Sequence, residues 1–312
     1  MKARDVWHLV KQTFIEWNDD NASRLAAALA YYTIFSLAPL LVITIGLAGM
    51  VFGDDAVQGH VVTQLEGYIG SRGATFVQDM IVASRKPGHS LAATVIGVVV
   101  LLFGAAGVFR QLQDALNAIW EVTPRPGRGW RGLLLDRALA FVMVLGTGLM
   151  LLLSVGLSAA FATLGSYLSQ LLPIPESALH ALNFAVSFAL ITVLFAFIFK
   201  VVPDAVVAWR DVWIGAALTA LLFAVGTLLI GLYLGKSGVT STFGAAASLA
   251  ILLVWIYYSA QILFLGAEFT QVYAGWRERQ IRPARRAVAA PRKGREEPHQ
   301  GEQGEAPRDG QS

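Results

Sequence analysis

Residues 241–274, STFGAAASLAILLVWIYYSAQILFLGAEFTQVYA, decide the fold class of this chain. Within this stretch, residues 245–267 carry no formal charge. At about 1.5 Å of helical rise per residue, such a run crosses a hydrocarbon core about 30 Å thick. Glu268 follows the uncharged run directly, and a basic run begins at Arg277. The stretch therefore predicts the last crossing of a membrane protein.

The composition of the whole chain agrees with this prediction. Of the 312 residues, 55% are hydrophobic and 14% are charged, whereas about 25% of the residues of a soluble domain are charged. The chain has no cysteine, which excludes disulfides, cysteine metal ligands and a thiol nucleophile. We therefore predict an all-α integral membrane protein.

Five further apolar segments precede the last one, so the sequence predicts a bundle of six transmembrane helices. The first segment is too long for a secretory signal peptide, and we expect it to stay in the membrane. Pro39 within it predicts a tilt or a break. The membrane domain covers residues 25–276, with spans at about residues 25–52, 91–109, 138–164, 181–202, 212–234 and 245–272.

Residues 1–24 are predicted to form an N-terminal cytoplasmic amphipathic helix. At helical spacing, one of its faces carries Val6, Leu9, Val10, Phe14 and Trp17. Such a helix lies in the membrane interface, or it packs on the cytoplasmic end of the bundle, and both alternatives stay open. In the first outer loop, residues 54–90 contain two weakly amphipathic segments that predict short helices.

Residues 277–312 are predicted to form a basic cytoplasmic tail. The positive charge of residues 277–295 suits anionic lipid head groups, or it only anchors the topology. After Arg282 the tail is rich in Pro, Gly, Arg, Glu and Gln and has few large apolar residues that would drive ordering. We therefore expect most of it to be disordered.

The distribution of basic residues predicts the orientation. With six spans, 20 of the 24 Lys and Arg fall on the side that carries both termini, and 4 fall in the three loops on the other side. Positively charged segments stay in the cytoplasm. Both termini are therefore predicted to be cytoplasmic.

Four segments carry a resemblance to a known family. Residues 25–39, LAAALAYYTIFSLAP, and residues 255–274, WIYYSAQILFLGAEFTQVYA, resemble the opening and closing motifs of the YihY/BrkB family of bacterial inner-membrane proteins. DALNAIW at residues 114–120 and PDAVVAWRD at residues 203–211 fit the same pattern. The resemblance covers roughly residues 5–276, and the tail lies outside it.

The resemblance implies a six-span, multi-pass protein of the bacterial inner membrane. Family members carry virulence or serum-resistance labels, and some are associated with moving lipids or envelope precursors. An older label, tRNA-processing ribonuclease, finds no support in the residues, because metal-dependent ribonucleases need clustered His and Asp ligands. The five histidines are scattered, at His8, His60, His89, His180 and His299. We expect no enzymatic activity, no metal, no other cofactor and no nucleic-acid partner.

Polar residues at the predicted cytoplasmic ends of the spans form the candidate site. Ionisable residues at membrane depth mark pathways and usually have a partner. We expect a polar vestibule for a lipid head group, formed by Arg110, Asp114, Asn117, Asp204, Arg210 and Glu268. The pathway would continue inward along Tyr31, Tyr32, Ser36, Pro39, Tyr257, Tyr258 and Gln261.

Each part of this site has a purely structural alternative. Glu268 would form a salt bridge to Arg24 or Arg110 that locks the bundle, and the hydroxyl groups near Pro39 would bond to neighbouring helices. Long side chains at helix ends also reach water and then need no functional explanation.

Two functions follow from these alternatives. The first is a transporter or flippase of a lipid or of an amphipathic envelope component. The second is a non-transporting membrane scaffold or envelope-integrity factor. The expected partners are membrane lipids, a second copy of the chain, or other envelope proteins.

Overall fold

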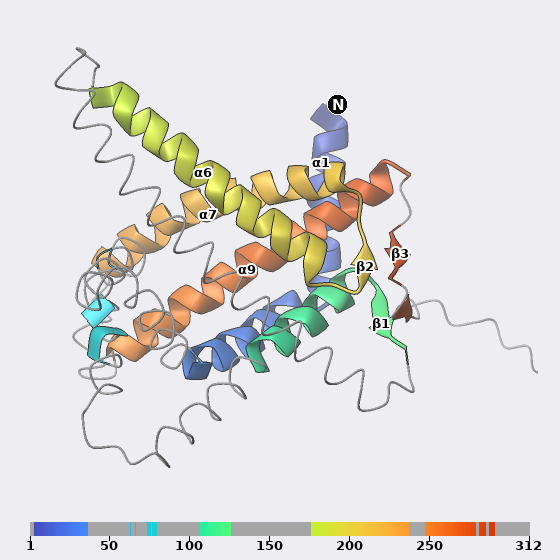
Figure 1. Cartoon of the computed structure of the whole chain (residues 1–312), viewed down its shortest axis with the longest axis horizontal. Coiled ribbons are helices and arrows are strands. Elements are labelled where there is room, and N and C mark those ends of the chain that lie inside the picture. Colours follow the sequence, from blue (N-terminus) through green and yellow to red (C-terminus); the bar gives the residue numbers. More distant parts are fainter. Residues whose placement is uncertain are drawn as a thin grey trace, which may run out of the picture.

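The computed structural model describes residues 3–36, 63, 66, 74–75, 77–79, 107–125, 176–236, 247–278, 281–284 and 287–290 (Figure 1). Helices dominate these residues, and short strands lie together at one end of the bundle. We call this end the strand end.

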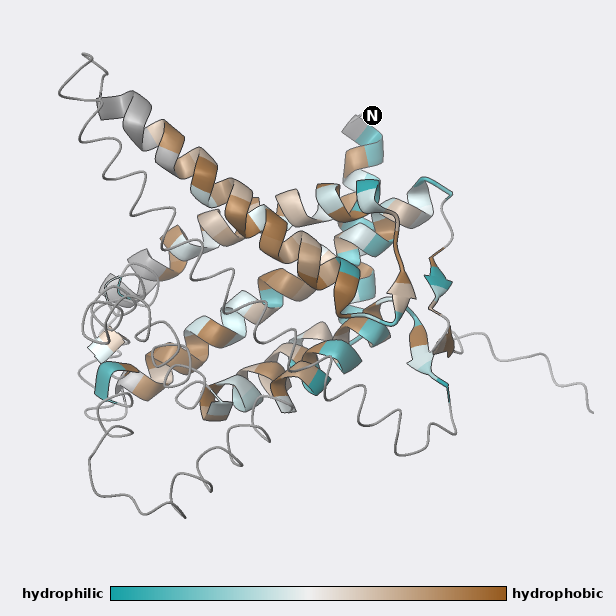
Figure 2. Cartoon of the chain, viewed as in Figure 1, coloured by the Kyte–Doolittle hydropathy of each residue, from teal (hydrophilic) through white to brown (hydrophobic). Residues whose placement is uncertain are grey.

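Within the described residues, three helices are long and apolar enough to cross a membrane. They are α6 (Glu176–Val201), α7 (Trp209–Lys236) and α9 (Ala247–Trp276). Large apolar side chains stay exposed on their outer faces, among them Phe184, Leu228 and Leu253. Hydrophobic colour runs along α6 in Figure 2, whereas hydrophilic residues gather near the strands. An apolar exterior suits helices that face lipid, and the spans predicted at residues 181–202, 212–234 and 245–272 coincide with these helices.

The three helices pack in sequence, α6 against α7 and α7 against α9. The α7–α9 crossing rests on Gly215 and Thr219 of α7 and on Gly266 and Thr270 of α9. A Cβ atom added at Gly215 would collide with Thr270, and one added at Gly266 would collide with Thr219. Each threonine thus occupies the space that the opposing glycine leaves free, which is how small residues bring membrane helices close together.

Three further helical segments are described, at residues 3–19, 22–36 and 107–119. Helix α1 (Ala3–Asp19) packs against α9 and buries Leu9 and Thr13. The chain turns at Asn21, whose φ of 55° is left-handed, and residues 22–36 continue as a second helix. Residues 107–119 form the third segment, which ends beside Glu121 at a φ of 52°. Left-handed residues commonly end helices.

Two antiparallel strand pairs close the strand end. Strand β1 (Val122–Pro124) pairs with β4 (Ala287–Ala289), and β2 (Ala205–Val206) pairs with β3 (Arg282–Pro283). The C-terminal segment therefore joins two connections that lie far apart in the sequence.

The strands β3 and β4 correct the prediction of a disordered tail for the residues that form them. The backbone of the tail supplies the order: the Ala284 N–H donates to the Asp204 carbonyl at 2.8 Å, and the Ala290 N–H donates to the Glu121 carbonyl at 2.8 Å. Backbone pairing needs no apolar side chains, so composition did not reveal it. Ala287 is nevertheless buried.

Several predictions lie outside the described residues. They concern residues 37–52 of the first span, most of the second span, the third span at residues 138–164, most of the first outer loop, and the tail beyond residue 290. The six-span count stays a prediction.

Candidate polar site at the strand end

The first group of site residues surrounds Asp204, in the connection between α6 and α7. The Asn117 Nδ2 and Gln113 Nε2 groups each donate to Asp204 Oδ2 at 3.3 Å. The Asp204 backbone N–H in turn donates to Asn117 Oδ1 at 2.7 Å. The amide of Asn117 is buried, so this two-sided contact fixes the connection to the helix of residues 107–119. Gln113 was not among the predicted site residues, although it lies one helical turn from Asn117 on the same face.

Three other predicted vestibule residues lie nearer the surface. The side chains of Arg110, Asp114 and Arg210 are exposed. The surrounding protein atoms nevertheless raise the pKa of the Asp114 carboxyl through desolvation; the Arg110 charge lowers that pKa, and the Asp204 charge raises it. Asp114 therefore interacts electrostatically with two other residues of the predicted vestibule, Arg110 and Asp204.

Glu268 is different, because its side chain is 0% exposed. Neither carboxyl oxygen has a hydrogen-bond partner among the described residues. The predicted salt bridge to Arg24 or Arg110 is not formed there, and both arginines are exposed instead. The charged groups that act on Glu268 are acids: Asp20, Glu16 and Glu121.

Other buried polar atoms also lack partners among the described residues. They are the indole Nε1 atoms of Trp17 and Trp120 and the Oε1 atom of Gln261. Gln261 precedes Glu268 by seven residues, or two helical turns, so the two side chains share one face of α9. Both tryptophans belong to or pack against the main core. Unsatisfied polar groups are uncommon in protein interiors, and each calls for an explanation.

The described residues of the predicted pathway belong to two helices, residues 22–36 and α9. Tyr31 and Tyr32 are exposed, with their rings in edge contact at a centroid distance of 5.8 Å. Ser36 is buried, and its hydroxyl donates to the Thr33 carbonyl at 3.1 Å. Pro39 lies outside the described residues.

Tyr257 and Tyr258 of α9 are half-buried. Tyr257 packs against the main core. Tyr258 lies on α7 at Gly226, where an added Cβ would come within 2.8 Å of the tyrosine hydroxyl oxygen. This contact tightens the α7–α9 interface instead of lining a space.

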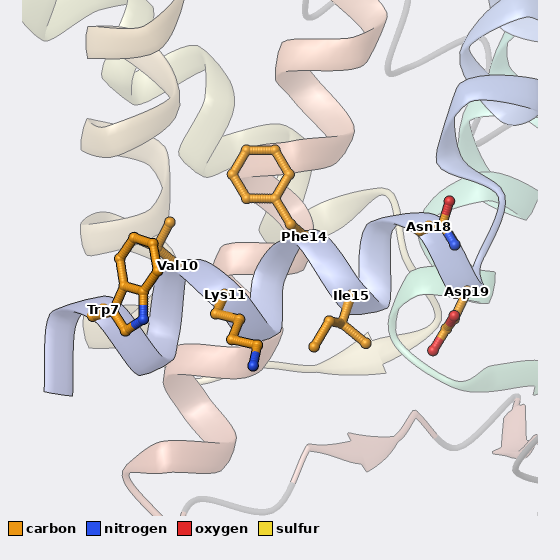
Figure 3. Close-up of a pocket in the computed structure, with 7 residues that line it drawn as sticks. All are labelled: Trp7, Val10, Lys11, Phe14, Ile15, Asn18 and Asp19. Carbon is orange, nitrogen blue, oxygen red and sulfur yellow. The ribbon is translucent and has the colours of Figure 1, made fainter. Parts of the chain in front are cut away.

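A pocket of about 620 Å³ lies along α1 and was not predicted. Figure 3 shows its lining along one length of this helix: Trp7, Val10, Lys11, Phe14, Ile15, Asn18 and Asp19. Trp7 and Phe14 are 69% and 55% exposed, so α1 buries one face against α9 and leaves an aromatic face open. The predicted apolar stripe is therefore divided between two faces. As for metals, no three His, Asp or Glu side chains gather as ligands in the part of the chain that the structure describes.

Comparisons with known proteins agree on one family. The family model described as Virulence factor BrkB matches residues 13–291. Among curated proteins, the chain is 29% identical over 269 residues to a UPF0761 membrane protein of Rhodospirillum centenum, covering 85% of this chain and 57% of the relative. A UPF0761 membrane protein of Pseudomonas aeruginosa is 30% identical over 259 residues, or 80% of this chain and 58% of the relative. The chain thus spans less than two thirds of these relatives. No solved structure matches it.

Proposed function

The chain belongs to the Virulence factor BrkB family, and on that premise we propose that it is a transporter or flippase of a lipid or of an amphipathic envelope component. Its place is the bacterial inner membrane, which it crosses six times with both termini in the cytoplasm. The strand end is then the cytoplasmic end, and Glu268 lies close to it.

The observation that carries this proposal is the state of Glu268. An acidic residue at the centre of a membrane helix costs about 2.5–3.5 kcal/mol by insertion measurements, and less near the helix end. The Glu268 carboxyl is fully buried, and it has no hydrogen-bond partner among the described residues that would offset that cost. Intramembrane ionisable groups of this kind mark substrate or ion pathways.

The surroundings of α9 support a role at the lipid boundary. The open face of α1 combines Trp7 and Phe14 with Lys11, the composition of helices that lie in the membrane interface. The tail adds positive charge near the same end, which would attract anionic head groups.

The test is a leaflet assay in liposomes. The purified protein is reconstituted, and the movement of a fluorescent phospholipid between leaflets is followed for the wild type and for Glu268→Gln. The matched control is Glu278→Gln, because Glu278 is an exposed acid just beyond α9. We expect wild type and control to move lipid and Glu268→Gln to fall to the rate of empty liposomes. Equal rates in wild-type and empty liposomes would reject phospholipid as the substrate.

A scaffold role is the second candidate, and the α7–α9 crossing favours it. Interlocked glycines and threonines leave little freedom for these helices to separate, and the strand pairs tie the tail to two connections. In this case the leaflet assay shows no movement. Crosslinking in native membranes should then capture a second copy of the chain or another envelope protein.

A further inference from the structure

We propose that Glu268 is a proton-binding site, which holds a proton in the described conformation at neutral pH and exchanges it with water at the strand end. The burial of the carboxyl and the groups around it indicate this site. Its link to transport rests on the function proposed above, but the binding of the proton does not.

The first step concerns hydrogen-bond donors. An ionised carboxylate inside a protein needs donors or a cation beside it. Neither oxygen of Glu268 has such a donor among the described residues. Thr270, two residues further along α9, lies on the opposite side of the helix, and its hydroxyl donates to the Gly266 carbonyl at 2.6 Å. On α7, the Thr219 hydroxyl donates to the Gly215 carbonyl at 2.7 Å. The hydroxyls at the crossing are therefore already used within their own helices.

The second step concerns charge. Helix α1 and its end bring Glu16 and Asp20 within electrostatic reach of Glu268, and the segment after residue 119 brings Glu121. Helix α7 begins with exposed Arg210 and buried Asp211. These acids disfavour ionisation of Glu268, because nearby negative charges favour the protonated form of a carboxyl.

The third step identifies the ligand. A bound metal ion would need several oxygen ligands around it, and no three acids gather in this way among the described residues. A proton needs a single carboxyl. Glu268 can take it up as a neutral acid without any rearrangement of its neighbours.

The fourth step is a route to water. Glu16, Asp20 and Glu121 are all half-buried and act electrostatically on Glu268, so each offers a partly water-exposed carboxyl near the buried one. Buried indole N–H groups directly adjoin two of these acids in the sequence, Trp17 after Glu16 and Trp120 before Glu121. A movement of α1 or of the 107–119 helix relative to α9 would let these indole N–H groups donate to an ionised Glu268. The carboxylate would then be stabilised, and the proton could leave to water.

Infrared spectroscopy of the purified protein in nanodiscs tests the proton site directly. We expect the carbonyl-stretch band of a protonated carboxylic acid in the wild type at pH 7. The band should disappear in Glu268→Gln and persist in Glu278→Gln. If Glu268→Gln does not fold, Glu268→Asp keeps the acid and should shift the band. A wild type without this band, or a band that none of the Glu268 variants alters, would overturn the proposal.

The coupling is measured separately. A pH gradient across liposomes should change the rate of lipid movement in the wild type, and the gradient should have no effect in Glu268→Gln. A protonated Glu268 without lipid movement keeps the proton site and rejects the transport of phospholipid. Lipid movement without the infrared band supports the transport of phospholipid and rejects the proton site.

Discussion

Two faces of α9 differ in whether their buried polar groups are hydrogen-bonded. At the α7–α9 crossing, the hydroxyls of Thr219 and Thr270 are bonded to backbone carbonyls, and glycines accommodate them. On the face that carries Gln261 and Glu268, buried oxygens lack partners among the described residues. On α9 itself, Thr270 lies within about three helical turns of Gln261 and Glu268. The face at the crossing, which we call the satisfied face, explains how α7 and α9 hold together. On the other face, the polar groups form no described hydrogen bond that would stabilise the fold, so folding does not explain why they are there.

The largest expected effect belongs to the satisfied face. Gly215→Ala places a Cβ against Thr270, and overpacking of this kind costs about 1–3 kcal/mol. We expect a clear fall in the thermal unfolding midpoint in detergent. Gly275→Ala is the matched control on α9, because its Cβ meets nothing within 4 Å. Equal midpoints for the two variants would show that the α7–α9 crossing accommodates a Cβ at residue 215 and does not depend on this glycine.

The next effect tests a second satisfied group, at Asp204. Asn117→Ala removes both of its hydrogen bonds to Asp204 and leaves a buried space, at a cost of about 1–3 kcal/mol. Gln113→Ala removes a single bond and should cost about 0.5–1.5 kcal/mol. Chemical denaturation measures both. The reverse order of the two losses would show that Asn117 does not fix this connection.

Much of this architecture could be predicted from sequence, and the reasons are local. Hydropathy decides whether α6, α7 and α9 can cross a membrane, and it is a property of consecutive residues. The two Gly-x-x-x-Thr patterns, at Gly215 and Gly266, are also present in the sequence, but spacing within one helix does not show which glycine faces which threonine.

The remaining features depend on contacts between distant segments. Strand β4 pairs with β1 through backbone groups, and composition says nothing about such pairing. The sequence predicts Glu268 at the cytoplasmic end of the last span, in a polar vestibule or, as the structural alternative, in a salt bridge to Arg24 or Arg110. Glu268 is instead completely buried, and the acids that act on it, Glu16, Asp20 and Glu121, come from segments far from α9 in the sequence.

A moderate effect is expected from the tail. Truncation after residue 280 removes β3 and β4, and each lost hydrogen bond is worth about 1 kcal/mol. Amide hydrogen exchange in β1 and β2 should therefore become faster, by up to about tenfold for each bond lost. Truncation after residue 290 keeps both strands and is the control. Unchanged exchange after the longer truncation would show that the strand pairs add no order.

The smallest effect concerns Asp114, which is more exposed than Glu268. Its pKa is raised in the folded protein, so the folded state binds the proton more tightly than the unfolded chain does. This contribution to stability is greatest at acidic pH and is lost as the pH rises through the folded pKa. Asp114→Asn should therefore be neutral or slightly stabilising at pH 7, by less than about 0.5 kcal/mol because water screens the exposed group. Destabilisation at pH 7 would indicate that the ionised carboxyl has a stabilising partner.

The contrast between the two faces of α9 is tested most directly by comparing the stability and the lipid movement of Glu268→Gln in the same preparation. We predict an unfolding midpoint close to that of the wild type, because glutamine resembles the protonated acid in shape, together with the loss of lipid movement between leaflets. Retained lipid movement at wild-type stability would contradict the account, since Glu268 would then serve neither folding nor transport.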